Sequence, residues 1–84
     1  MNTYRIETIT PTNGKAFDRV VSTNAVGEDR TSWTVRDDKV DEQSLSYSGG
    51  TSWNRDSLIQ NYDGNAELTE LLVELIRRAD EAGL

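Results

Sequence analysis

Acidic side chains are the residues of this sequence whose type and spacing could carry chemistry. Their densest run contains Asp37, Asp38, Asp41 and Glu42. A calcium loop would follow the pattern D-x-[DN]-x-[DN]-G-x5-E, with a glycine at the sixth position for the sharp turn. The run has neither this spacing nor this glycine. We therefore interpret it as a solvated loop or a partner-binding surface rather than a metal site.

A second row of carboxylates follows the outer face of a predicted C-terminal helix. Its members, Glu67, Glu70, Glu74 and Glu81, are three to seven residues apart, so neighbouring carboxylates advance about 4.5–10 Å along the helix axis. Phosphates of one DNA strand advance about 3.4 Å each along the duplex, and the row is therefore a conceivable DNA mimic. Arg77 and Arg78 interrupt it, however, and i,i+4 ion pairs such as Glu74–Arg78 favour an ordinary exposed helix face.

Residue types that most catalytic and metal sites require are missing. The 84 residues contain no His and no Cys, which excludes a Ser-His-Asp triad, a thiolate nucleophile and a zinc site with thiolate or imidazole ligands. A chain of this length leaves little depth for a substrate pocket, so we predict no enzyme activity and no cofactor. Without cysteines there is no disulfide framework, and a reducing cytoplasm is the expected compartment. No apolar run approaches the roughly 20 residues of a membrane span, and the N-terminus lacks the apolar core of a signal peptide.

The two tryptophans admit two interpretations. An aromatic side chain at an interface is often a binding hot spot, but in so small a domain Trp33 and Trp53 are expected mainly in the core. Trp53 is followed by the polar residues Asn54-Arg55-Asp56. It is therefore the better candidate for a partner contact at the rim.

The elements that must position these residues begin with a predicted hairpin. Residues 4–10 and 15–22 are β-like runs around Asn13-Gly14, a strong signal for a two-residue turn. With that turn, strand alternation predicts a core face made of Tyr4, Ile6, Phe17 and Val21. Ile9 and Val20 would then point to the second face of the sheet.

The middle of the chain is predicted from short apolar runs and glycines. We assign residues 22–30 to a loop and residues 31–35 to the third strand. A charged connection follows at residues 37–42, and the fourth strand covers residues 43–48. A three-residue loop at residues 49–51 would pair Tyr47 with Trp53 and keep both rings on one face. Residues 56–62 fit either a fifth strand or one helical turn, because seven residues are too few for periodicity to decide.

A long amphipathic helix is predicted over residues 66–82. Its apolar positions recur with helical spacing and form one stripe: Leu68, Leu71, Leu72, Leu75, Ile76 and Ala79. Asn65 is the expected N-cap and Gly83 the expected stop. Strands followed by one long helix predict a single α+β domain over residues 1–84. In that domain the helix packs on one face of a four- to five-stranded antiparallel sheet.

The net charge of -6 is the strongest functional indicator. It disfavours direct binding of nucleic acid, because no basic strip offsets the phosphates, and it favours a basic protein or nucleoprotein complex as partner. In size, charge and lack of cysteine the whole chain resembles small acidic anti-CRISPR and anti-restriction proteins. This resemblance implies a phage or mobile-element inhibitor that blocks the basic nucleic-acid groove of a host defence complex. The candidate partner-binding residues are Asp37, Asp38, Asp41, Glu42, Glu67, Glu70, Glu74 and Trp53.

Two other functions compete with this hypothesis. The acidity could serve only the solubility or salt adaptation of a housekeeping accessory module, in which case salt would raise stability by screening carboxylate repulsion. An open sheet edge, or the second face with Ile9 and Val20, could instead form a homodimer.

Overall fold

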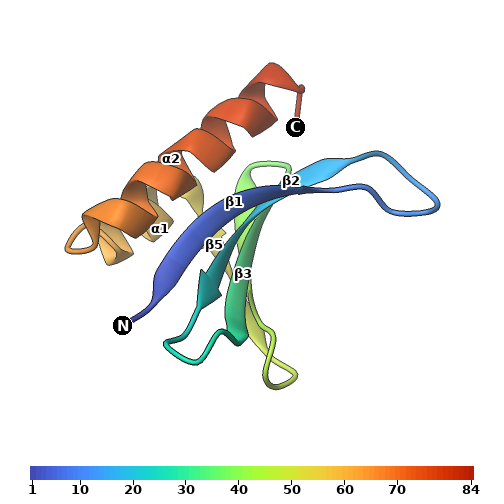
Figure 1. The fold of residues 1–84 in the computed structure, drawn as a ribbon. Coiled ribbons are helices and arrows are strands. Elements are labelled where there is room, and N and C mark those ends of the chain that lie inside the picture. Colours follow the sequence, from blue (N-terminus) through green and yellow to red (C-terminus); the bar gives the residue numbers. More distant parts are fainter.

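The computed structural model describes all residues from Met1 to Leu84 and contains five strands and two helices. These elements are β1 (Thr3–Ile9), β2 (Phe17–Thr23), β3 (Asp29–Arg36), β4 (Lys39–Ser44), β5 (Gly50–Asn54), α1 (Arg55–Asn61) and α2 (Ala66–Glu81). Consecutive strands pair antiparallel in the order β1-β2-β3-β4-β5. Both helices lie on one side of the sheet, and the other face of the sheet is open (Figure 1). The predicted α+β class, an antiparallel sheet with a C-terminal helix on one face, is confirmed.

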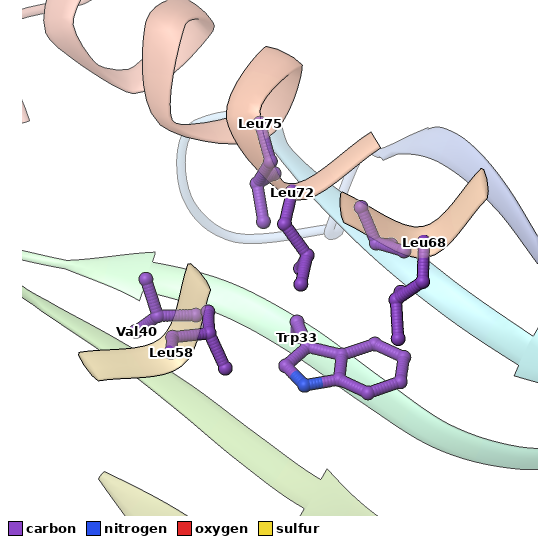
Figure 2. Packing of buried hydrophobic residues seen from close by; sticks show 7 residues of the cluster. Trp33, Val40, Leu58, Leu68, Leu72 and Leu75 are labelled. Carbon is purple, nitrogen blue, oxygen red and sulfur yellow. The ribbon is translucent and has the colours of Figure 1, made fainter. Parts of the chain in front are cut away.

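The hydrophobic core fills the space between the helices and the sheet. Its most buried side chains are Val20, Trp33, Val40, Leu58, Leu68, Leu72 and Leu75. The leucines of α2 point toward Trp33 on β3 (Figure 2). Leu58 is fully buried in α1, so residues 56–61 of the ambiguous segment belong to a short helix that extends the core over β4 and β5, and Tyr62 is its C-cap. Burying one such side chain contributes about 1.5–3 kcal/mol, and together these contacts fix both helices on the sheet.

α2 begins at the predicted residue and ends one residue before the predicted end. The Asn65 Oδ1 atom accepts the backbone N–H of Leu68 at 3.1 Å, which satisfies one of the free donors at the helix start. The Asn65 Nδ2 atom donates to the Tyr4 hydroxyl at 2.9 Å, so the cap also holds α2 against β1. At the other end Gly83 has a φ of 79°, a left-handed conformation that glycine adopts without steric cost.

The register of the first hairpin differs from the prediction. Asn13-Gly14 lies within a longer connection of residues 10–16, and Ile6 therefore faces Val20 instead of Val21. A shift of one residue turns every side chain of β2 to the opposite face. The reason is core packing, because Val20 belongs to the core cluster and pairs with Trp33 of β3, whereas Val21, which is equally buried, lies on the other face. The second face consequently carries Ile9, Phe17 and Val21, where the prediction had Ile9 and Val20.

The fourth strand begins four residues earlier than predicted. Only Asp37-Asp38 form the turn before it, and the rest of the charged run pairs within the sheet. Trp53 pairs with Val40, not with Tyr47. Val40 is fully buried, whereas Tyr47 is 73% exposed. Val40, the single apolar residue of the charged run, therefore determines the position of β4, and the more apolar segment after β4 stays at the surface.

The two remaining loops also differ in extent. The connection between β2 and β3 covers only residues 24–28, and that between β4 and β5 covers residues 45–49 rather than 49–51. Gly50 already pairs with Gln43 in the sheet. A Cβ atom at Gly50 would lie 2.5 Å from the Glu42 carbonyl oxygen, so this close approach of β5 to β4 requires glycine.

Candidate functional site

The open face of the sheet neutralises its own charges. The Arg5 guanidinium donates to Asp29 at 3.0 and 3.1 Å and to Glu7 at 3.1 Å. Arg19 donates to the other oxygen of Glu7 at 2.6 Å. The hydrogen bond from Arg19 is the largest cause that lowers the pKa of Glu7, and the one from Arg5 lowers the pKa of Asp29. Each carboxylate of this network thus has a cation and offers little charge to a partner.

The predicted acidic run is divided among three environments. Asp37 and Asp38 are exposed at the β3–β4 turn, and neither carboxylate has a cation within 4.0 Å. Asp41 lies on the open face and accepts from Arg36 at 2.7 and 3.1 Å, and this contact lowers the pKa of Asp41. Glu42 lies on the helix-covered face, because successive side chains of a strand alternate. The structure therefore does not bring the four carboxylates together.

Glu42 is held inside the molecule by neutral donors. Its Oε1 atom accepts the indole N–H of Trp33 at 2.9 Å, the indole N–H of Trp53 at 3.2 Å and the hydroxyl of Tyr62 at 2.8 Å. Burial, followed by the bond to this carboxylate, raises the pKa of Tyr62. The Tyr62 and Trp33 rings meet edge to face with centroids 5.9 Å apart. Trp53 is thus half-buried and points to the core side rather than standing free at the rim.

The carboxylate row of α2 is shorter than the sequence suggested. Glu67 and Glu70 are exposed and have no cationic partner. Glu74 accepts from Arg77 at 2.6 and 2.8 Å and from Arg78 at 2.8 Å, and these two arginines lower its pKa to about 2. The i,i+4 ion pairs at the C-terminal end of the helix are present as predicted. Glu81 accepts from Arg77 at 2.5 Å, so two carboxylates of the row, not four, are available to a partner.

Six carboxylates are exposed and have neither a cation within 4.0 Å nor a side-chain hydrogen bond, and we name them the free carboxylates. They are Asp37, Asp38, Asp56, Asp63, Glu67 and Glu70. They belong to the β3–β4 turn, to α1, to the α1–α2 connection and to the start of α2. Residues 55–84 contain seven carboxylates and three arginines, so they carry -4 of the total charge of -6. The surplus negative charge is therefore concentrated in the helical layer.

Arg55 joins this layer to the sheet. It donates to the Asp80 carboxylate at 2.5 Å and to the backbone carbonyls of Asp37 at 2.7 Å and Leu84 at 3.2 Å. These contacts place the start of α1 beside the β3–β4 turn and the end of α2. Sequence reasoning gave Arg55 no role, because its partners are 18 to 29 residues away along the chain and no local pattern signals them.

No group of three or more acidic side chains is close enough together to hold a metal ion. Neither helix is long and apolar enough to span a membrane. In comparisons with known proteins, no family model, no curated protein and no solved structure matches this chain.

Proposed function

We propose that this chain is a non-enzymatic module that binds a basic surface of a protein or nucleoprotein complex through the free carboxylates of its helical layer. One observation carries the proposal. Asp63, Glu67 and Glu70 follow one another at the α1–α2 connection and the start of α2 without any cationic partner. Seven carboxylates elsewhere in the chain have an arginine within 4.0 Å.

The position of these three carboxylates suits a binding surface. They stand at the N-terminal end of α2, where the helix dipole stabilises negative charge. They are exposed, and no bond within the chain has to be broken to bring them to a partner. Complementary charge accelerates the encounter and orients the complex, so a positive surface is the partner that this end of the molecule favours.

A groove that holds nucleic acid is a strongly positive surface, since it must offset a dense row of phosphates. The most concrete form of the proposal is therefore an inhibitor, encoded by a phage or mobile element, that occupies such a groove on a host defence complex. In this form the module and the nucleic acid compete for one site.

Two variants of equal net charge test the proposal. In the first, Asp63→Asn, Glu67→Gln and Glu70→Gln neutralise the three carboxylates. In the second, lysines replace the exposed residues Thr12, Asn13 and Ala25 in two loops of the sheet. Both variants change the net charge by +3, but only the first alters the proposed surface.

Capture of partners from host lysate, followed by affinity measurement on the complex recovered, distinguishes the variants. We expect the wild type and the loop-lysine variant to bind with similar affinity, and the neutralised variant to bind roughly tenfold more weakly. If both variants bind as the wild type does, the carboxylates serve solubility alone and the proposal is wrong.

A further inference from the structure

Glu42 differs from every other partly buried carboxylate of the chain. The others are Glu7, Asp18, Asp41 and Glu74, and each has an arginine within 4.0 Å. Glu42 has no cation, and the donors that hold it are two indoles and a phenol. Its negative charge is therefore hydrogen-bonded but not neutralised inside the molecule.

The two oxygens of this carboxylate have different surroundings. All three donors converge on Oε1, which leaves no further room for hydrogen bonds on that atom. No donor of the chain reaches Oε2. Because Trp33 is only 2% exposed and packs in the core, the carboxylate cannot turn its charge away without breaking these bonds. Glu42 is thus fixed with one oxygen available.

Glu42 lines a polar cavity of about 260 Å³. Thr31, Ser44 and Thr51 line it together with Glu42, and the strand pairing places Thr31 opposite Ser44 and Thr51 opposite Glu42. Their hydroxyl groups can accept as well as donate hydrogen bonds. Arg30 also borders the cavity, at the point where the register between β2 and β3 shifts, and neither an ion pair nor a side-chain hydrogen bond joins it to Glu42.

An aromatic ring stands at the edge of the same cavity. Tyr47 is 73% exposed, and its ring lies so close to Gly49 that a Cβ atom there would be 3.0 Å from Tyr47 Cε2. Glycine thus lets the ring rest on the β4–β5 loop beside the cavity. The face of an exposed tyrosine attracts a cation that approaches within about 6 Å of the ring.

We propose that this cavity binds an organic cation, a guanidinium or ammonium group, through Glu42 Oε2, the surrounding hydroxyls and the ring of Tyr47. An anion is excluded because it would face an uncompensated carboxylate, and a single carboxylate provides too few ligands for a metal ion. That the cation is an arginine or lysine side chain of the basic partner rests on the proposed function. The binding of the cation itself does not, because Glu42 is not one of the free carboxylates.

A titration of the labelled protein by NMR, observing the indole N–H signals of Trp33 and Trp53, tests this proposal. The probes are N-acetyl-arginine amide and N-acetyl-lysine amide, with N-acetyl-norleucine amide as an uncharged control of similar length. We expect at least one of the two cations to shift both indole signals saturably at millimolar concentration, as suits a single side-chain contact. We expect no saturable shift with norleucine. Absence of a saturable shift with either cation, or equal shifts with norleucine, would overturn the proposal.

Three variants locate the site. Glu42→Gln keeps the shape but removes the charge and should weaken binding of the cation at least tenfold, while Asp38→Asn, which alters an exposed carboxylate outside the cavity, should leave it unchanged. Should Glu42→Gln fail to fold, Tyr47→Ala removes an exposed ring without touching the core and should weaken binding severalfold. Unchanged binding in the folded Glu42→Gln variant, or in Tyr47→Ala where that variant replaces it, would contradict the site. The triple variant Asp63→Asn, Glu67→Gln, Glu70→Gln should still bind the probes, so failure of the proposed function would be seen separately.

Discussion

The open face of the sheet and the helical layer differ in how many of their carboxylates have a cationic partner. On the sheet, Arg5 and Arg19 neutralise Glu7 and Asp29 within one network. In the helical layer most of the net charge is left without a cation, above all around the start of α2. The acidity of this chain is therefore not uniform. Carboxylates of the open face hold strands together, whereas four of the seven in the helical layer are left to the solvent or to a partner.

Both regions depend on the same core, and truncating a core side chain should have the largest effect on stability. Leu72 is fully buried between α2 and the sheet, whereas the adjacent Val73 is 52% exposed. Leu72→Ala should lower the free energy of unfolding by about 2–5 kcal/mol, and Val73→Ala should change it by less than about 0.5 kcal/mol. Urea unfolding followed by tryptophan fluorescence measures both. Similar losses in the two variants would show that α2 does not pack through its leucine stripe.

Acid should weaken the ion pairs of both regions, those on the open face and the one at Glu74 in α2. Arginines lower the pKa values of Glu7, Asp29, Asp41 and Glu74 below their ordinary values of 3.8 to 4.5. A carboxylate with a lowered pKa stabilises the folded state above its unfolded pKa, and this contribution is lost as the pH falls through the folded value. The free energy of unfolding should therefore be constant down to about pH 5 and decline below it, with the part due to Glu74 lost only as the pH approaches about 2. A stability that stays level between pH 5 and pH 2.5 would contradict the ion-pair network.

Neutralising a single carboxylate should change the stability differently in the two regions. Glu7→Gln removes a charge that two arginines bind and should cost about 1 kcal/mol of unfolding free energy. Glu70→Gln removes a charge without a partner and should cost nothing, or slightly stabilise the chain by relieving repulsion. The two variants have the same chemistry and differ only in their surroundings. Equal losses of stability would mean that the pairing on the open face contributes little.

Local patterns predicted α2 better than they predicted α1 or the sheet. The stripe and caps of α2 depend on residues close together in sequence, so periodicity and Asn65 sufficed to predict its bounds to within one residue. The register of β2 depends on the burial of Val20 beside Trp33, 13 residues further along, and a turn signal such as Asn13-Gly14 carries no information about that contact.

Local patterns also predicted only part of the candidate site. Glu67 and Glu70 were recognisable because helix geometry places them on an outer face. Glu42 was predicted in a loop, since the charges around Val40 concealed a strand. Alternation of Val40, Glu42 and Ser44 was the available signal, but the donors from Trp33 and Tyr62 come together only through the tertiary fold.

The salt dependence of association tests most directly whether the helical carboxylates bind a basic surface. The measurement is the association rate constant between the chain and its captured partner across a range of ionic strength. For the wild type we predict a steep fall of this constant with salt, and for the triple variant Asp63→Asn, Glu67→Gln, Glu70→Gln a lower constant with a clearly shallower slope. Identical slopes for the two proteins would contradict a binding surface at the start of α2.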